Sequence, residues 1–230
     1  MTDAPDPVSR ILTTRTVSPP PNLKKIAEAY VRQAIFSGKL RPAQKIDQDA
    51  IADQFGFSKL PVREALISLE HEGIVENIPR RGAFVANLTR EDILDHYWLI
   101  ALTAGIAAHR AAGQLDDEQL GELGRVLDEL DTAGSPARMD ELNGLFHRMI
   151  NRAGGTLRLR SALRLLSQTM PENFFEFAQG WNENASAQHH RIFAALSASD
   201  GAEAERAMVD HIKAGGQFAV RRLEEVGFWD

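Results

Sequence analysis

Apolar residues recur at three- and four-residue intervals through the first third of the chain, which is the spacing of a helix with one buried face. Three segments show it, at residues 22–38, 47–56 and 58–73. Asp47 and Ser58, which are favoured N-cap residues, open the second and third segments. Each of these two segments ends at a glycine, as helices commonly do. The pattern predicts three helices, of which the middle one is short.

The helical spacing then gives way to two short apolar runs, Ile74–Asn77 and Ala83–Asn87, separated by a Pro79-Arg80-Arg81-Gly82 turn. Such runs on either side of a glycine-containing turn predict an antiparallel β-ribbon. Helix, short helix, turn, helix and ribbon together make the winged helix-turn-helix layout. We therefore expect residues 20–88 to form a winged helix-turn-helix domain.

Residues 89–230 show the helical spacing throughout, apart from a looser stretch at Pro171–Gly180. Helices are predicted at about 90–112, 116–133, 136–153, 156–169, 184–198 and 202–225. This pattern predicts an all-α helical bundle. Residues 1–19, which end at the first of three consecutive prolines, are predicted to be a flexible arm. The predicted fold class is mainly α, with one small β-ribbon.

The chain has 230 residues and no cysteine, which excludes disulfides, a thiolate nucleophile and cysteine-based zinc or iron–sulfur sites. Any metal must be held by histidine, carboxylate or amide groups. No apolar run approaches the ~18 residues of a membrane span. The first residues lack the apolar segment of a signal peptide. We expect a cytoplasmic protein that does not enter a membrane.

The net charge of −6 is unevenly distributed along the chain. Residues 20–88 carry 10 basic and 8 acidic side chains, whereas residues 89–230 carry 14 basic and 22 acidic ones. A mildly basic segment joined to an acidic one is typical of a nucleic-acid-binding protein that has a second domain.

The stretch SKLPVREAL, residues 58–66, lies where the recognition helix is expected. Lys59 and Arg63 are four residues apart and share one face of that helix. Arg can donate two hydrogen bonds to guanine in the major groove, and Lys can contact a base or a phosphate. Ser58 can cap the helix and donate to a phosphate.

Two cations and a glycine, Arg80, Arg81 and Gly82, lie at the tip of the predicted ribbon. They suit contact with phosphates or with the minor groove. The alternative, solvated cations on an ordinary surface, is disfavoured by the order of the elements. One recognition helix reads too few base pairs for useful specificity, so we expect a homodimer on a pseudo-palindromic operator.

With these motifs, residues 22–88 resemble the DNA-binding domain of the GntR family of bacterial transcription regulators, through SKLPVREAL and through LEHEGIVENIPRRGAFVANL at 69–88. Residues 89–230 resemble the family's FadR-type ligand-binding domain, called FCD. The resemblance implies DNA contacts by Arg41, Lys59, Arg63 and Arg80–Gly82. It also implies that a small-molecule effector controls operator binding, which we interpret as repression relieved by the effector.

Histidines form the second candidate site. Asn143 and His147 lie four residues apart on one predicted helix, so their side chains can converge. In the FCD pattern an acidic or amide residue and three histidines hold a divalent metal. Matched by position, the resemblance implies Asn143, His147, His190 and His211 as ligands. His189 precedes His190 but points about 100° away on a helix. Imidazole ligands suit zinc, nickel or a related ion, although a lone histidine is more often structural.

The resemblance further implies a small carboxylate effector, for which many FCD domains use an arginine on their first helix. Here no arginine lies between Arg90 and Arg110. The candidate effector contacts are Trp98, Arg148, Phe174 and Trp181. Aromatic residues at such spacing are also typical of a packed core. We expect an organic acid beside the metal; the alternative is a structural metal with an effector that is not a carboxylate.

A metal-dependent enzyme is the alternative class. Di-metal helical bundles carry Glu-x-x-His pairs, but Gly144 stands three residues before His147. Asp210 adjoins His211 but lies off its helix face. The sequence also shows no phosphate-binding loop, nucleophile elbow or dinucleotide fingerprint. These observations favour a DNA-binding regulator over an enzyme.

Overall fold

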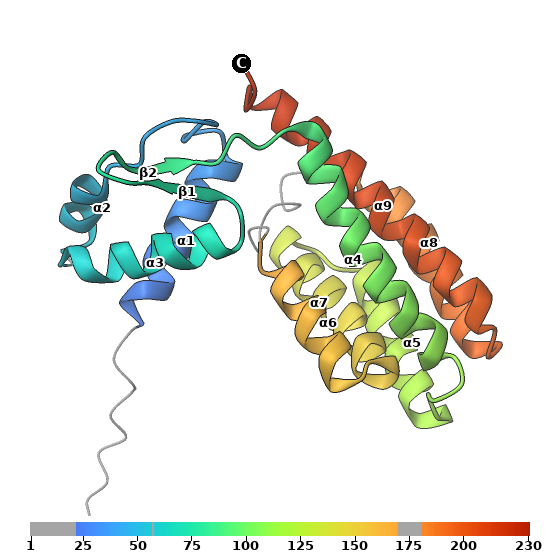
Figure 1. Ribbon diagram of the computed structural model, residues 1–230. Helices are drawn as coiled ribbons and strands as arrows, with labels where there is room; N and C mark the ends of the chain where they lie inside the picture. The colour runs from blue at the N-terminus through green and yellow to red at the C-terminus, as the bar shows by residue number, and fades with distance from the viewer. Residues whose placement is uncertain (1–21, 57, 170–180) are drawn as a thin grey trace, which may run out of the picture.

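The computed structural model describes residues 22–56, 58–169 and 181–230, without the side chains of 181–184. The N-terminal part contains α1 (Leu23–Phe36), α2 (Gln48–Phe55), α3 (Lys59–His71), β1 (Val75–Ile78) and β2 (Gly82–Val85). The C-terminal part contains α4 (Arg90–Ala111), α5 (Asp117–Asp131), α6 (Pro136–Gly154), α7 (Leu157–Ser167), α8 (Trp181–Ser197) and α9 (Gly201–Glu225). Figure 1 shows the two parts side by side. The predicted fold class is confirmed; the predicted arm and the Pro171–Gly180 stretch lie outside the described residues.

The first helix of the helix-turn-helix unit, α2, begins and ends as its cap residues predict. Asp47 accepts hydrogen bonds from the backbone N–H groups of Asp49 and Ala50, both at 3.0 Å, at the start of α2. Gly56 ends that helix with a φ of 65°, a left-handed conformation that glycine adopts without steric cost. On α3, the four residues of the predicted apolar stripe are all buried: Val62, Ala65, Leu66 and Leu69.

The wing is an antiparallel ribbon in which Val75 pairs with Val85 and Ile78 with Gly82. The first strand begins one residue later than predicted, and the second ends two residues earlier. At the turn, in contrast, each strand extends one residue further than predicted, because Gly82 (φ 100°) pairs directly with Ile78 and the turn holds only residues 79–81. Residues 43–46 add backbone hydrogen bonds along the outer side of β2, including Ile46 N–H to the Ala83 carbonyl at 2.9 Å.

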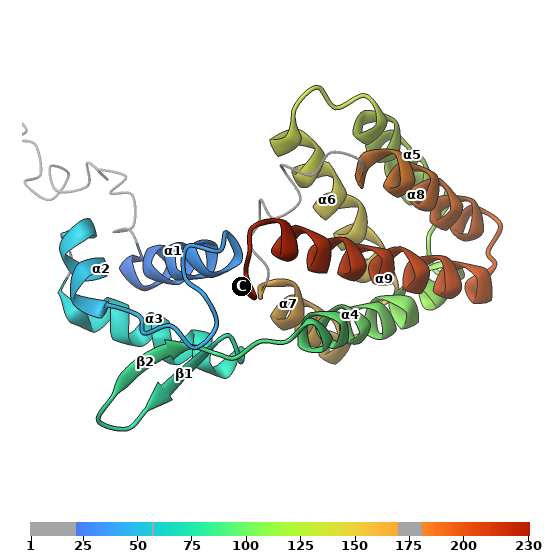
Figure 2. The same ribbon diagram turned by 90° about the horizontal axis from the view of Figure 1, so that it is seen from above.

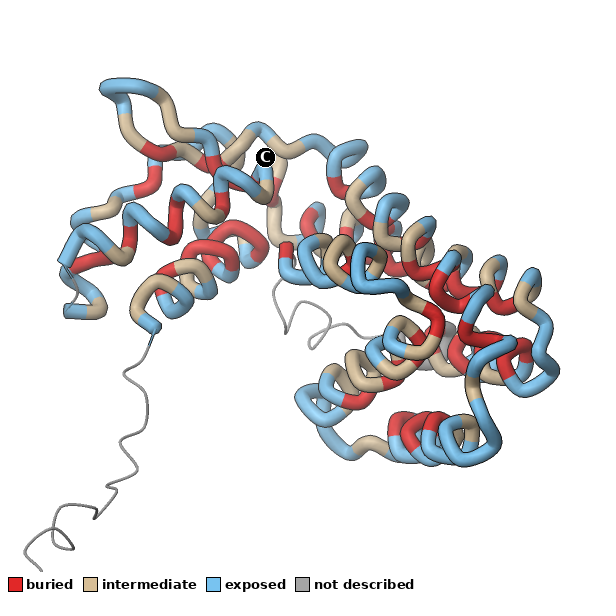
Figure 3. The backbone as a smooth tube through the Cα atoms, turned by 60° about the horizontal axis from the view of Figure 1, so that its bottom comes forward, coloured by how far each residue is buried: buried red, intermediate tan, exposed pale blue. Residues whose placement is uncertain are grey.

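The C-terminal part is organised around α4 and α9, which run antiparallel and side by side in both views (Figures 1 and 2). Small residues allow their close approach. A Cβ atom at Gly105 would lie 2.8 Å from Val209, and one at Gly216 would lie 2.7 Å from Tyr97. Figure 3 shows buried segments where the helices face each other. A second core forms between α4, α5, α6, α8 and the first half of α9.

The end of α9 crosses the predicted domain boundary. Ala219, Leu223 and Phe228 are fully buried in the same core as the winged helix-turn-helix residues. The Trp229 indole N–H donates to the Leu88 carbonyl at 2.8 Å. On the other side of the junction, the buried Arg32 guanidinium donates to both carboxylate oxygens of Glu72 and, at 2.8 Å, to the Thr169 carbonyl. The two parts are therefore joined by packed side chains as well as by the linker, residues 86–89.

Within the part of the chain that the structure describes, no helix combines the length and apolar character required to cross a bilayer.

We predict that Gly216→Ala destabilises the protein by about 1–3 kcal/mol, because its methyl group would collide with Tyr97 across the α4–α9 contact. The matched control is Gly121→Ala in α5, where nothing lies within 4 Å of the added methyl group. That change should stabilise the protein by about 0.5–1 kcal/mol, because alanine is the better helix former. Urea denaturation measures both, and the close-approach argument is wrong if Gly216→Ala does not lower the free energy of unfolding.

Candidate DNA interface and metal centre

Hydrogen-bond donors at the start of α3 face solvent. Ser58 occupies the N-cap position, but its hydroxyl makes no capping hydrogen bond. Pro61 stands at the third helical position and has no N–H to donate, so one usual partner of the cap is missing. The predicted cap position is thus correct and the predicted side-chain cap is wrong. The hydroxyl and the first N–H groups of α3 can donate to a phosphate.

Lys59 and Arg63 are both exposed on α3. The Lys59 ammonium lies 2.8 Å from the Asp49 carboxylate, and this hydrogen bond raises the pKa of Lys59. Both side chains of the pair are about two-thirds exposed, where an ion pair contributes little and can be exchanged for a phosphate contact. Arg63 belongs to none of the ion pairs found among the described residues.

The wing tip gathers three cations. Arg80 has a φ of 64°, and the Arg81 guanidinium lies over the Phe84 ring, 5.4 Å from its centroid. Lys45 pairs with Phe84 and lies beside Gly82, since a Cβ atom at Gly82 would be 3.5 Å from the Lys45 Cε. No local pattern marks Lys45, because only the folded chain brings it to the ribbon.

Arg41 lies at the junction with the end of α9. Its Nη1 donates to the carbonyl oxygens of Gly227 and Asp230 at 2.7 and 2.9 Å. This guanidinium is engaged within the chain, so we leave it out of the candidate DNA interface.

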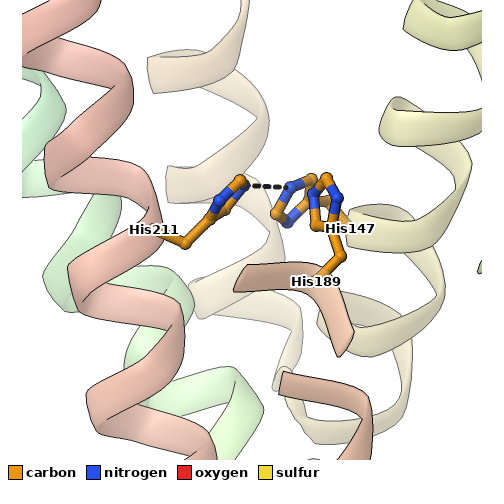
Figure 4. A group of neighbouring side chains, drawn as sticks. All are labelled: His147, His189 and His211. Carbon is orange, nitrogen blue, oxygen red and sulfur yellow. Dashed lines mark hydrogen bonds between the residues drawn. The ribbon is translucent and has the colours of Figure 1, made fainter. Parts of the chain in front are cut away.

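Three histidines from three helices meet inside the C-terminal part: His147 of α6, His189 of α8 and His211 of α9 (Figure 4). One ligand atom from each lies within 4.8 Å of the other two. Nε2 of His147 and Nε2 of His211 are 3.2 Å apart. Two nitrogens bound to one tetrahedral zinc are about 3.3 Å apart, given Zn–N bonds of ~2.0–2.1 Å. The three rings thus form a compact set of nitrogen donors.

Burial keeps these imidazoles neutral. It lowers the pKa of His147 to about 4. Burial, together with repulsion from His147, lowers the pKa of His189 to about 3. The pKa of His211 is also lowered, first by burial and then by the other two rings. A neutral imidazole is the form that binds a metal.

Hydrogen bonding supports the same interpretation. The Gln188 side-chain oxygen lies 3.0 Å from Nδ1 of His211 and accepts a hydrogen bond from it. The proton is then on Nδ1, and the unprotonated Nε2 can bind a metal in the cluster. Both ring nitrogens of His189 are buried, and neither has a hydrogen-bond partner. Unsatisfied buried nitrogens are costly, and a bound ion would satisfy one of them. The residues present therefore fit a metal.

The structure places His189, and not the predicted His190, in the histidine cluster. On α8 the buried positions are Ala185, His189, Ile192, Ala195 and Leu196, so the residue after His189 points away from the core. His190 is half-exposed, and its Nε2 lies 2.7 Å from the Asp131 carboxylate of α5. The apolar spacing of α8 was the sequence signal that could have selected His189.

The remaining predicted residues are dispersed. Asn143 lies one turn before His147 on α6 and stays a predicted ligand. Trp98 is 48% exposed, with the Lys213 ammonium 4.2 Å from its ring centroid, so it faces outward rather than into an effector pocket. Arg148 is exposed and folds back over Gly144. Phe174 and the Trp181 side chain lie outside the described residues.

Chemically, the cluster suits metal binding better than hydrolysis. Among the described His, Asp and Glu residues, the group contains three histidines and no carboxylate that could act as a general base. The nearby Asp131 carboxylate is held by the Ser186 hydroxyl and by His190.

A winged helix-turn-helix joined to a helical C-terminal domain defines a class of DNA-binding regulators, and comparison with known proteins specifies the family. Residues 23–85 match bacterial regulatory proteins of the gntR family, and residues 99–214 match the FCD domain. The chain belongs to the FCD-containing regulators of the gntR family. FCD domains often bind a metal, and these domains are those of a transcription regulator rather than an enzyme.

The relatives agree with this assignment. An uncharacterized HTH-type transcriptional regulator of Mycobacterium tuberculosis is 33% identical over 147 residues, which span 64% of this chain and 60% of the relative. The HTH-type transcriptional repressor RspR of Escherichia coli is 25% identical over 80% of this chain and 82% of its own length. Among solved structures, E. coli McbR/YncC shares the fold with a TM-score of 0.64 at 20% identity, covering 86% of this chain and 97% of that one.

We predict that the metal-free protein loses stability as the pH falls from 6.5 toward 4. The pKa values of the three clustered histidines are lower in the folded state than the ordinary 6.5, so the unfolded chain takes up protons first. Each histidine contributes up to about 1.4 kcal/mol per pH unit in this window and nothing above it. Urea denaturation of chelator-treated protein at pH 7 and pH 5 measures the loss. His189→Leu should reduce the difference by about a third; equal stability at both pH values would contradict the prediction.

Proposed function

We propose that this protein is a FadR-type, homodimeric repressor that binds a pseudo-palindromic operator and is released from it by a small organic acid bound beside a divalent metal. The observation that carries the proposal is the position of α9. This helix contributes His211 to the histidine cluster, and its last turns are buried in the core of the DNA-binding domain. A change at the cluster therefore has a direct mechanical connection to the DNA-binding elements.

For DNA, α3 would enter the major groove with Lys59 and Arg63 leading, while the wing tip contacts the backbone or the minor groove. Ser58, Arg80, Arg81 and Gly82 complete the proposed interface, together with Lys45. The cations on α3 and those at the wing tip are exposed, and this exposure supports the proposal.

For the effector, His147, His189 and His211 would hold the ion, with Asn143 as the additional candidate and zinc or nickel as the candidate metals. The bound ion would supply positive charge that attracts a carboxylate into an otherwise acidic domain. The chain's own residues keep three neutral nitrogens in place and orient them, as Gln188 does for His211. The acid shifts operator affinity only if it favours one arrangement of the DNA-binding domains, typically by about 1–3 kcal/mol.

We predict that Arg63→Ala lowers operator affinity about tenfold or more and relaxes base preference at one position in each half-site. The operator can be selected in vitro from random duplexes, and affinity is then measured by fluorescence anisotropy at fixed salt. Arg206→Ala is the control, since this arginine is 62% exposed on α9 and remote in sequence from α3 and the wing. Unchanged affinity of Arg63→Ala would show that α3 does not read the operator.

We predict that His189→Ala abolishes stoichiometric zinc binding and the response of operator affinity to an organic acid, whereas His190→Ala preserves both. The two neighbouring histidines point in different directions. A ring nitrogen of His189 faces the cluster, whereas Nε2 of His190 lies beside the Asp131 carboxylate. Elemental analysis of untagged protein gives the metal content. Operator titrations with citrate and with benzoate, an aliphatic and an aromatic acid, test the response.

The two variants separate the possible failures. If His190→Ala loses the metal and His189→Ala keeps it, the ligand set is wrong. If both acids act equally on wild type and on the metal-free His189→Ala, the effector binds away from the metal. If wild type binds no zinc or nickel, the metal part of the proposal fails.

A further inference from the structure

The short helix α7 is basic, although it belongs to the acidic part of the protein. From residue 142 to residue 169 the chain contains five arginines and no Asp, Glu or Lys. Residues 89–230 carry 14 basic and 22 acidic side chains, and all 22 acidic ones lie outside this run. Three of the five arginines belong to α7: Arg158, Arg160 and Arg164. The acidic part therefore contains one locally basic helix.

The outer face of α7 also carries two large apolar side chains. Leu157 is 71% exposed and Leu165 is 67% exposed, which are the highest values among the large apolar residues of the described chain. Eight residues separate the two, so they lie about 80° apart around the helix and face the same side. Leu163 points the other way and is buried in the second core. We call Leu157, Leu165 and the three arginines of the helix the α7 patch.

The arginines border the two leucines on the exposed side of the helix. Successive residues differ by about 100°, which places Arg160 and Arg164 on one side of Leu157. Arg158 lies next to Leu165 on the other side. All three arginines are exposed. The α7 patch is therefore an apolar centre with a cationic rim, and an apolar centre with a polar rim is the usual composition of a protein-binding surface.

The arginines occupy positions that the helix itself disfavours. Arg158 and Arg160 lie in the first turn, where the helix dipole favours anions, and no acidic residue is present there. Arg160 and Arg164 are four residues apart and repel each other. The Arg164 guanidinium donates to the Ser161 hydroxyl oxygen at 3.4 Å, and no carboxylate among the described residues forms an ion pair with any of the three. Carboxylates supplied by a ligand would offset both unfavourable effects.

We infer that the α7 patch binds an acidic amphipathic segment of another protein, in which apolar residues are flanked by Asp or Glu. The carboxylates of this segment accept hydrogen bonds from the arginines, and its apolar side chains cover Leu157 and Leu165. Arginine suits such a surface because its planar guanidinium pairs with a carboxylate through two hydrogen bonds. The leucines favour a protein over DNA as the partner, since phosphate contacts require cations but no apolar surface.

The α7 patch lies near the DNA-binding part and apart from the histidine cluster. The helix ends two residues before Thr169, whose carbonyl oxygen accepts a hydrogen bond from Arg32 of α1 at 2.8 Å. The clustered histidines come from α6, α8 and α9, and Figure 1 shows α7 on the side of the C-terminal part that is opposite α8. A partner on α7 would therefore lie close to the DNA-binding elements without occupying either site of the proposed function.

A synthetic peptide tests the chemistry of the α7 patch. The probe is a fluorescein-labelled helical peptide with leucines along one face and glutamates on both sides of them. Its binding to the full chain is measured by fluorescence anisotropy, and the affinity of the wild type should fall as salt is added. Arg160→Glu/Arg164→Glu should weaken binding at least about tenfold, and Leu157→Ser/Leu165→Ser should do the same.

Two controls separate a built surface from general electrostatic attraction. Arg125→Glu/Arg206→Glu changes the net charge by the same amount at two exposed arginines outside the α7 patch, and it should bind the probe as the wild type does. The variant Arg160→Glu/Arg164→Glu should instead bind a second probe in which lysine replaces every glutamate. Circular dichroism establishes that the variants are folded, which is expected because the substituted side chains are exposed.

Each other outcome overturns the inference. A wild type that does not bind the acidic probe, or variants that bind it as tightly as the wild type, would show that α7 does not recognise such a segment. If Leu157→Ser/Leu165→Ser changes the oligomeric state in light scattering, a second copy of the chain covers the patch. If the arginine variant loses affinity for a duplex without the operator and not for the probe, the patch contacts DNA. Operator affinity should be the same in all these variants, so failure here leaves the proposed function intact.

Discussion

The close packing of α4 against α9 is the contact on which the rest of the structure depends. Gly105 and Gly216 leave room that any larger residue would fill, so the two longest helices can touch along their length. Because α9 is held in this way, His211 faces the other two histidines and Phe228 reaches the DNA-binding core. The outer side of α4 faces water and carries exposed apolar side chains.

Burial is the second organising constraint, and it acts on polar groups as strongly as on apolar ones. In the histidine cluster it removes the charge from three imidazoles and leaves both nitrogens of His189 without a partner. Such groups are rarely kept in a core without a ligand to satisfy them. At the domain junction the buried Arg32 is instead fully engaged, by Glu72 and by the Thr169 carbonyl. In the first site two buried nitrogens have no hydrogen-bond partner, whereas in the second the buried guanidinium is fully paired.

These contacts connect the histidine cluster with the DNA-binding elements through packed atoms. The end of α9 contacts the linker through Trp229 and holds the Arg41 guanidinium at its last carbonyls. Arg90, at the start of α4, stacks on Trp229 and pairs with Glu224. A displacement of α9 relative to α4 would therefore alter the orientation of the winged helix-turn-helix, which is what an effector must achieve to change operator affinity.

The sequence by itself determined the local structure: helix positions, the caps at Asp47 and Gly56, the wing and the inward stripe of α3 all follow from spacing and backbone preference. It also indicated two of the three clustered histidines. Tertiary structure alone decided that Lys45 joins the wing and that Arg41 and Trp98 lie elsewhere. The choice of His189 over His190 follows from the apolar spacing of α8, because neighbouring residues on a helix differ by about 100° and only His189 shares the face of Ala185, Ile192 and Leu196. Contacts between distant segments, such as α9 in the N-terminal core, depend on how whole helices pack and leave no local pattern in the chain.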